Sequence, residues 1–153
     1  MKYSTDTSAI LDGWRRNYPP DVFPAWWERV EEAIADGRLR ATEEVLVELE
    51  RKDDEVYAWA KKHADLFVAI DEAIQEAVTR ILDQHEKLLD TRANRSSADP
   101  FVIALAQVNG CAVVTGERAT GSLTRPHIPD VCTTLNVPVM TVLDVARAEG
   151  WRF

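Results

Sequence analysis

Four acidic residues stand where a carboxylate could take part in chemistry: Asp6, Glu48, Asp99 and Glu117. Asp6 follows a short extended segment at residues 2–5, and Glu117 lies two residues beyond the apolar, β-branched run at 111–115. In open α/β sheets, reactive groups lie beyond the carboxyl ends of the strands. We therefore expect these four carboxylates, which come from separate segments, to converge at one edge of a sheet.

A cluster of carboxylates is unfavourable by itself, because like charges in a cleft repel one another. Hard divalent cations with oxygen ligands relieve this repulsion, and Mg²⁺ and Mn²⁺ are the usual ones. A metal ion bound in this way activates water and stabilises in-line attack on a phosphodiester. The pattern of acids therefore predicts metal-dependent hydrolysis of a phosphodiester.

Each acid also has a purely structural interpretation, which the sequence leaves open. Asp6 can simply cap a helix. Asp99 followed by Pro100 is a typical helix start, with the acid as the cap and proline at the first helical position. Glu48 can belong to a solvated helix face, and Glu117 can be surface charge in a loop. The functional interpretation rests on the spacing of the whole set.

The composition is that of an ordinary globular protein. The chain has 153 residues, of which 46% are apolar and 29% charged, and we expect a single domain over residues 1–153. No apolar stretch is long enough for a membrane helix, and the first residues lack the apolar run of a signal peptide. Cys111 and Cys132 have no metal-ligand or redox spacing, which favours a reducing, cytoplasmic location.

The charge balance bears on the class of ligand. The chain has 18 Lys and Arg residues against 26 Asp and Glu residues, for a net charge of −8. Such a chain does not hold nucleic acid by charge alone, because phosphate binding needs clustered cations. Bound divalent cations would return positive charge at the point where a phosphate must lie.

Helix-like and strand-like segments alternate along the chain. Strands are predicted at 2–5, 38–41, 111–115 and 137–142. Helices are predicted at 9–16, 24–35, from 42 to a charged break at 51–54, around 56–60, and at 70–89, 99–108, 130–135 and 143–149. Residues 91–97 and 116–129 are predicted to be loops. This alternation predicts an α/β fold with a mainly parallel central sheet flanked by helices.

The set of motifs resembles the PIN-domain ribonucleases, the family that includes the VapC-type toxins of bacterial toxin–antitoxin systems. The matching segments follow the order of that family across nearly the whole chain: Asp6-Thr7-Ser8, Thr42-x5-Glu48-Leu49, Ala98-Asp99-Pro100-Phe101-x2-Ala104-x-Ala106 and Gly110-x-x-Val113-Val114-Thr115-x-Glu117. The ending, from Ile128-Pro129-Asp130 to Gly150-Trp151-Arg152-Phe153, more closely resembles a PIN-like subgroup of small bacterial proteins of undefined function.

The resemblance implies a PIN-like fold and a function. Cleavage of RNA would depend on Mg²⁺ or Mn²⁺ held by the acidic cluster: Asp6, Glu48, Asp99 and Glu117. Ser8 or Thr115 would steady the carboxylates by hydrogen bonds. The resemblance further implies toxin activity, a cognate antitoxin that inserts a segment into the acidic cleft, and a homodimer.

The sequence departs from the family pattern at three points. The first strand is polar where the family is usually aliphatic, so we expect it to be short or near an edge of the sheet. The fourth acid is usually Asp, and Asp130 is the second candidate for this position after Glu117. Glu44 lies one helical turn before Glu48 and replaces it if the register differs.

Basic, aromatic and histidine side chains have competing interpretations. Four arginines in loops flank Asp99 and Glu117, either as clamps for RNA phosphates or as solubilising charge: Arg92, Arg95, Arg118 and Arg125. The tryptophans are interpreted as core or partner-facing residues rather than base-stacking ones. His85, on an apolar helix stripe, is interpreted as a packed, hydrogen-bonded residue.

Two other function classes compete with the nuclease. The fold can be retained as a protein- or RNA-binding module with a degenerate site, which the net charge and the Glu at position 117 favour. A phosphohydrolase with Asp6 as a covalent nucleophile is the third class. Dehalogenase-like enzymes of that class resemble Asp-x-Asp at this turn, and here Ser8 stands in place of the second acid.

Overall fold

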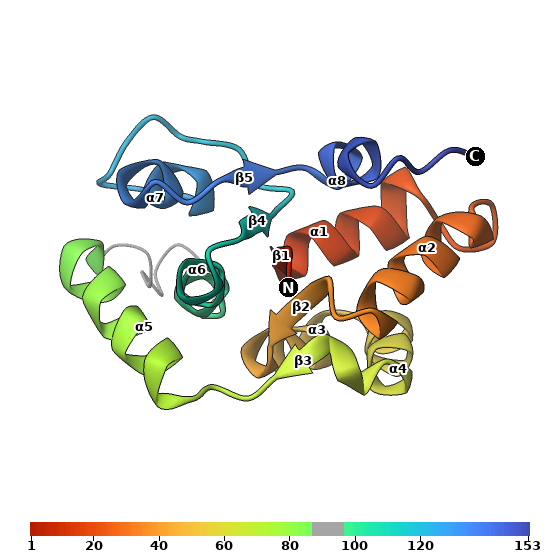
Figure 1. The fold of residues 1–153 in the computed structure, drawn as a ribbon, viewed down its shortest axis with the longest axis horizontal. Coiled ribbons are helices and arrows are strands. Elements are labelled where there is room, and N and C mark those ends of the chain that lie inside the picture. Colours follow the sequence, from red (N-terminus) through yellow and green to blue (C-terminus); the bar gives the residue numbers. More distant parts are fainter. Residues whose placement is uncertain (87–96) are drawn as a thin grey trace.

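A parallel sheet forms the centre of the computed structural model, which describes residues 1–86 and 97–153 (Figure 1). In this described part the sheet has five strands in the order β3-β2-β1-β4-β5, and every adjacent pair is parallel. The strands are Tyr3–Thr5 (β1), Leu39–Thr42 (β2), Phe67–Val68 (β3), Ala112–Val114 (β4) and Val139–Met140 (β5). The predicted α/β class is confirmed, and the strand order is compatible with a PIN-like topology.

The helices agree with the sequence periodicity except at their ends. They are α1 (Thr7–Asp12), α2 (Pro24–Ala35), α3 (Glu43–Lys52), α4 (Asp54–Lys62), α5 (Glu72–Gln84), α6 (Asp99–Asn109), α7 (Ile128–Leu135) and α8 (Val142–Ala148). A π-helical turn, η1 (Gly13–Asn17), continues α1, and a 3₁₀ turn, η2 (Ala64–Leu66), precedes β3. The helix predicted at 70–89 is shorter in the structure: it begins at Glu72 and ends at Gln84, with His85 as its C-cap. Residues 87–89 of this prediction and most of the predicted loop at 91–97 lie outside the described residues.

The polar first strand is the main departure from expectation. β1 is short, as predicted, but it is the central strand of the sheet and not an edge strand. Its polar groups are all bonded: the Tyr3 hydroxyl donates to Glu149, the Ser4 hydroxyl to the Val102 carbonyl of α6, and the Thr5 hydroxyl to the Asp6 carbonyl. A polar strand can be central when each buried polar group has a partner.

Helices cover both faces of the sheet. α6 packs across β1, β2 and β4 on the face towards which Ser4 points. Side chains alternate along a strand, so Thr5 points to the other face, where it meets Trp26 of α2 and Val145 of α8. β1 is therefore held between α6 on one face of the sheet and the side chains of α2 and α8 on the other.

One strand was missed by the sequence prediction, and one helix cap was assigned to the wrong residue. The strand β3 was not predicted, because two half-buried residues at a sheet edge leave no recognisable alternation. The predicted cap of α6 is wrong: Ala98 occupies the cap position, and Asp99 is the first residue of the helix. Asp99 does lie at the helix N-terminus, where the helix dipole favours a negative charge.

The aromatic and histidine interpretations are confirmed. Trp26, Trp27 and Trp59 are buried, and Trp14, Trp27 and Trp59 contact one another edge to face or tilted. His85 is buried, and its Nε2 lies 2.9 Å from the Thr134 hydroxyl of α7. Among the described residues, no helix is both long and apolar enough to span a membrane.

Candidate active site

Asp6 lies directly after the central strand, where β1 turns into α1. The backbone N–H of Asp6 donates to the Val114 carbonyl of β4, which continues the strand pairing by one residue. The Asp6 side chain is 2% exposed and accepts the backbone N–H of Ala9 at 2.7 Å, so it caps α1. The capping interpretation is therefore confirmed, and the same carboxylate also lies at the predicted edge of the sheet.

Two hydroxyl groups fix the orientation of this carboxylate. The Ser8 hydroxyl lies 2.9 and 2.8 Å from the two carboxylate oxygens of Asp6, and the Thr115 hydroxyl donates to Oδ2 at 2.5 Å. Thr115 comes from the end of β4, so the contact joins two adjacent strands. The sequence predicted either Ser8 or Thr115 in this role, and the structure uses both.

The environment of Asp6 favours its neutral form. Burial raises the pKa of Asp6 to about 7, and the negative charge of Glu117 adds to this rise. The hydrogen bonds from Thr115, Ala9 and Ser8 lower the pKa and offset the burial only in part. A cation beside the carboxylate would restore its ionised form.

Glu48 connects the start of α1 with the start of α6. Its side chain is buried, with the residue 4% exposed, which excludes the solvated helix face. The Thr7 hydroxyl donates to one carboxylate oxygen at 2.6 Å, and the Ala98 backbone N–H donates to the other at 3.0 Å. Thr7 is next to Asp6 in the chain, and Ala98 is next to Asp99, so Glu48 lies between the two aspartates. The register with Glu48 inward is the observed one, and Glu44 is half-buried.

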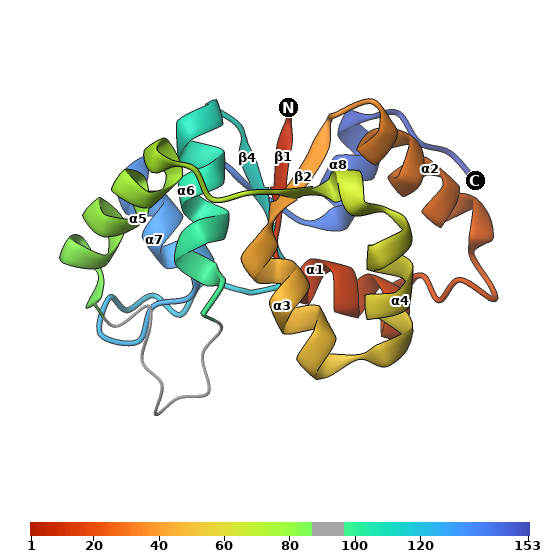
Figure 2. The same cartoon turned by 90° about the horizontal axis from the view of Figure 1, so that it is seen from below.

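A view from the side of the strands shows how the segments that carry these acids meet. Figure 2 shows α1, α3 and the beginning of α6 at the edge of the sheet opposite to the chain's N-terminus. Asp6, Glu48 and Asp99 belong to these three elements, and each is buried. Parallel strands end at the same edge, so segments far apart in sequence bring their acids to one place.

Glu117 and Asp130 lie at the N-terminus of α7. Glu117 is half-buried; its backbone N–H donates to the Thr115 hydroxyl, and its Oε2 accepts the N–H of Ile128 at 2.9 Å. The Asp130 carboxylate accepts backbone N–H groups of the preceding loop and of His127. Glu117 is thus linked to Asp6 through Thr115, whereas the carboxylate of Asp130 is engaged by its own loop.

The donor set is chemically suited to a hard divalent cation. Carboxylate oxygens are the ligands that Mg²⁺ prefers, and the negative charge of Glu117 near Asp6 adds to the demand for a cation at this edge. Across residues 1–86 and 97–153, however, no group of three or more His, Cys, Asp or Glu side chains is already arranged as a metal cage. In this structure the acids Asp6 and Glu48 are held by hydrogen bonds from the protein.

The predicted arginines divide into two sets. Arg118 and Arg125 are exposed in the loop between Glu117 and α7. Arg92 and Arg95 lie outside the described residues. Thr7, the partner of Glu48, was not among the predicted residues; its signal was only a hydroxyl side chain beside the first acid.

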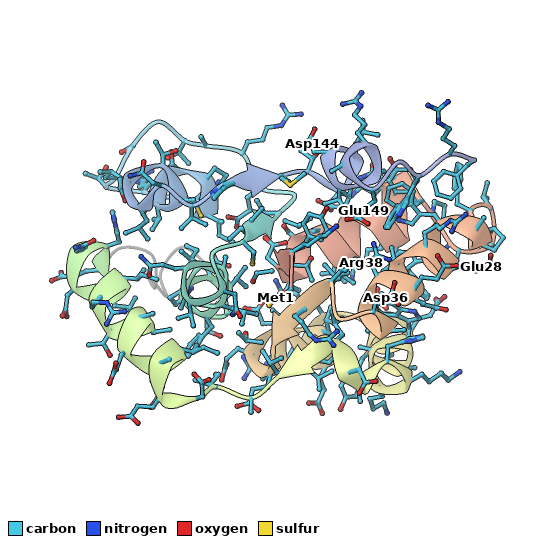
Figure 3. All side chains as sticks on the ribbon, in the orientation of Figure 1. Met1, Glu28, Asp36, Arg38, Asp144 and Glu149 are labelled. Carbon is cyan, nitrogen blue, oxygen red and sulfur yellow. The ribbon has the colours of Figure 1, made fainter. Side chains whose placement is uncertain are left out.

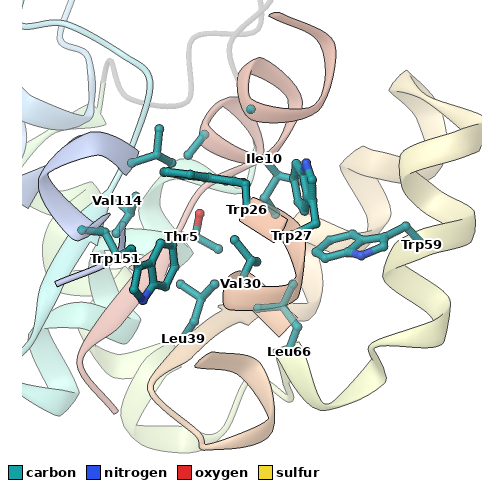
Figure 4. A pocket seen from close by; sticks show the side chains of 14 residues that line it. Thr5, Ile10, Trp26, Trp27, Val30, Leu39, Trp59, Leu66, Val114 and Trp151 are labelled. Carbon is teal, nitrogen blue, oxygen red and sulfur yellow. The ribbon is translucent and has the colours of Figure 1, made fainter. Parts of the chain in front are cut away.

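An apolar cavity lies behind the site, on the other face of β1 (Figure 4). It measures about 50 Å³, and its lining includes Thr5, Trp26, Trp27, Val114 and Trp151. Almost all of the lining is apolar, so this cavity does not suit a phosphate group. This cavity is therefore not part of the candidate acidic site.

The chain belongs to the family described as a domain of unknown function, DUF4411, whose family model matches residues 3–153. The match spans all four predicted acids. No curated protein matches the sequence.

Proposed function

We propose that this protein is a PIN-like, metal-dependent endoribonuclease that hydrolyses phosphodiester bonds of RNA. The observation that supports this best is Asp6, a buried carboxylate at the end of the central strand whose pKa is raised to about 7. Buried, strongly perturbed acids at the carboxyl end of a parallel sheet are typical of functional sites.

In this proposal the residues of the chain have distinct roles. Asp6, Glu48, Asp99 and Glu117 would hold the cation, and Ser8 and Thr115 fix the direction of the Asp6 oxygens. A bound Mg²⁺ or Mn²⁺ supplies an activated water molecule and stabilises in-line attack on phosphorus. Preorganisation of the carboxylates by hydrogen bonds avoids reorganisation at the moment of reaction.

Arginines near the acids support RNA as the substrate. Arg118 and Arg125 are exposed on the loop that begins at Glu117, where their guanidinium groups can bind phosphates. Arg92 and Arg95, in the segment that precedes Asp99, are proposed to do the same. This local positive charge would offset the net charge of −8 at the site of phosphate binding.

The biological role follows from the resemblance to the VapC-type toxins. We propose that the protein is the toxin of a bacterial toxin–antitoxin pair and forms a homodimer. Its antitoxin would insert a segment into the acidic cleft; the acids at this edge suit a basic segment.

One observation favours the alternative of a binding module with a degenerate site. The carboxylate of Glu117 accepts the N–H of Ile128, the first residue of α7, and so satisfies a hydrogen-bond donor at the N-terminus of that helix. A fourth acid used in this way contributes less to a metal site. The two proposals differ in a simple property, because only the nuclease needs a cation to be bound.

Thermal unfolding in millimolar Mn²⁺ or Mg²⁺ tests cation binding. We expect the metal to stabilise the wild type by about 1.4 kcal/mol at ten times the dissociation constant. Asp6→Asn and Asp99→Asn should lose this response. Asp65→Asn is the control, since Asp65 is an exposed acid in η2, before β3, at the other end of the strands.

Cleavage of structured RNAs is the second readout of the same variants. Both active-site variants should lose metal-dependent cleavage while keeping the wild-type circular dichroism spectrum, and Asp65→Asn should cleave normally. Undiminished cleavage by Asp6→Asn and Asp99→Asn would refute the proposed site. If wild type and variants all fail to respond to the metal, the binding module becomes the better description.

A further inference from the structure

The carboxylate of Asp130 is engaged by hydrogen bonds from one loop. Its oxygens accept the backbone N–H groups of Thr120 at 3.0 Å, Gly121 at 2.9 Å and His127 at 2.8 Å. The Thr120 hydroxyl lies 2.9 Å from Oδ2. A carboxylate has about four lone-pair positions, and three backbone N–H groups together with the shared Thr120 hydroxyl occupy most of this acceptor capacity. These bonds hold the pKa of Asp130 at about 2, so it is ionised at all physiological pH values.

Further contacts of Thr120 and His127, which both bond to Asp130, fix the course of the loop. The Thr120 hydroxyl also lies 3.1 Å from the Ser122 carbonyl and 3.0 Å from the Arg125 carbonyl, and its one proton is shared among these two carbonyls and the Asp130 carboxylate. Nδ1 of His127 lies 2.9 Å from the Arg118 carbonyl. The backbone at both arginines is thus tied, directly or through Thr120 and His127, to the segment that contains Asp130.

The two guanidinium groups themselves remain available. Arg118 and Arg125 are both exposed, and neither forms an ion pair with a residue that the structure describes. The loop begins at Glu117, whose N–H donates to Thr115, the residue that donates to Asp6. A hydrogen-bonded loop that begins beside the acidic edge therefore presents two cations without an ion-pair partner among the described residues.

We propose that Asp130 is a positioning residue that holds this loop so that Arg118 and Arg125 bind RNA phosphates beside the acidic site. The inference rests on the proposed function for the identity of the substrate. It assigns Asp130 to the arrangement of the loop and removes it from the metal ligands. Phosphate contacts position a nucleic acid without reading its sequence, so the effect of Asp130 is on substrate binding.

Two substitutions disturb the loop in different ways. Asp130→Asn replaces acceptor capacity with an NH₂ group that faces N–H donors, and Thr120→Val removes the hydroxyl that joins the carboxylate to the carbonyl groups. Asp144→Asn is the matched control, because Asp144 accepts the N–H and hydroxyl of Thr141 in the same way at the start of α8.

RNA affinity and kinetics are the readouts. With a fluorescent RNA, we expect Asp130→Asn and Thr120→Val to weaken binding about tenfold and to reduce the salt dependence by about one phosphate contact. In cleavage, KM should rise by the same factor while kcat stays within about twofold. Arg118→Ala with Arg125→Ala should reproduce the loss of affinity in an intact loop, and Asp144→Asn should bind as the wild type.

The outcomes separate this inference from the proposed function. Anisotropy measures RNA binding even if the wild type cleaves nothing, so failure of the nuclease proposal leaves the loop inference testable. Unchanged RNA affinity in Asp130→Asn and Thr120→Val would overturn it. So would loss of Mn²⁺-induced stabilisation in Asp130→Asn with Thr120→Val unaffected, because that result makes Asp130 a metal ligand.

Discussion

The carboxylate of Asp6 has two roles that are in conflict. As the cap of α1 it accepts a backbone N–H and stabilises the fold, but it is 2% exposed and lies near the negative charge of Glu117. A neutral amide would cap the helix nearly as well without the cost of a buried charge. The choice of a carboxylate here is therefore better explained by function than by stability.

This conflict predicts a specific dependence of stability on pH. The pKa of Asp6 is about 7 in the folded chain and 3.8 for an unperturbed aspartate side chain, so the folded state binds the proton more tightly than the unfolded state. The stabilising contribution is complete below about pH 4 and is lost as the pH rises through 7, at most about 4 kcal/mol. In metal-free buffer, Asp6→Asn should therefore be more stable than the wild type at pH 8.

Urea denaturation from pH 4 to 8 in the presence of EDTA measures this difference. The free energy of unfolding of Asp6→Asn should fall less across this range than that of the wild type. Other acids titrate in both proteins, so the difference between the two curves isolates Asp6. Parallel curves would mean that Asp6 is not ionising in the buried state described here.

At the scale of elements, one buried hydrogen bond joins the central strand β1 to α6. The Ser4 side chain is fully buried, and its hydroxyl donates to the Val102 carbonyl at 2.8 Å. This carbonyl is 98 residues away in sequence, so the bond fixes α6 against the strand that ends at Asp6. The geometry of the acids therefore depends on how these two elements pack.

Ser4→Ala tests this coupling between strand and helix. We expect a loss of about 1 kcal/mol in the free energy of unfolding, the usual contribution of one buried hydrogen bond. Thr79→Ala is the control, because Thr79 is exposed and its hydroxyl donates to a carbonyl within its own helix. Denaturant titration gives the free energy of unfolding of both variants. An equal loss in the two variants would show that the bond between β1 and α6 contributes no more to stability than the bond of an exposed threonine.

At the scale of the whole molecule, Glu149 joins the end of the chain to its beginning (Figure 3). It follows α8 and accepts the Tyr3 hydroxyl at 2.7 Å, and it pairs with Arg38 and, at 3.4 Å, with Lys2. These contacts lower the pKa of Glu149, and burial together with the carboxylate raises the pKa of Tyr3 to about 12. They link the start of β1, the residue before β2 and the end of α8 at the edge of the sheet opposite to the acids.

Glu149→Gln should destabilise the protein by roughly 2 kcal/mol, because the partly buried Arg38 would keep only Asp36 as a carboxylate partner. Glu28→Gln, an exposed substitution of the same type, should change little. Thermal unfolding of both variants gives the comparison. A Glu149→Gln protein as stable as the wild type would indicate that the pairing contributes nothing net.

Several features could be predicted from the sequence because their causes are local. The apolar run before Thr115, the proline and glycine punctuation of the helices and the alternation of strands and helices indicate a parallel α/β sheet. A parallel sheet places the ends of its strands at one edge, so Asp6 and Glu117 could be assigned to that edge from sequence alone. The helix pattern left a solvated Glu48 open, and the resemblance to the PIN-domain family assigned its carboxylate to the cluster.

Other features were decided only by tertiary contacts between residues far apart in the chain. The polar β1 is central because Ser4 and Tyr3 bond to residues 98 and 146 positions away, and a local pattern contains no information about such partners. Asp130 resembled a fourth metal ligand, yet its oxygens are taken by a loop whose course the sequence does not specify. Composition and periodicity determine which segments form strands and helices, whereas the partner of each buried polar group depends on how those elements pack.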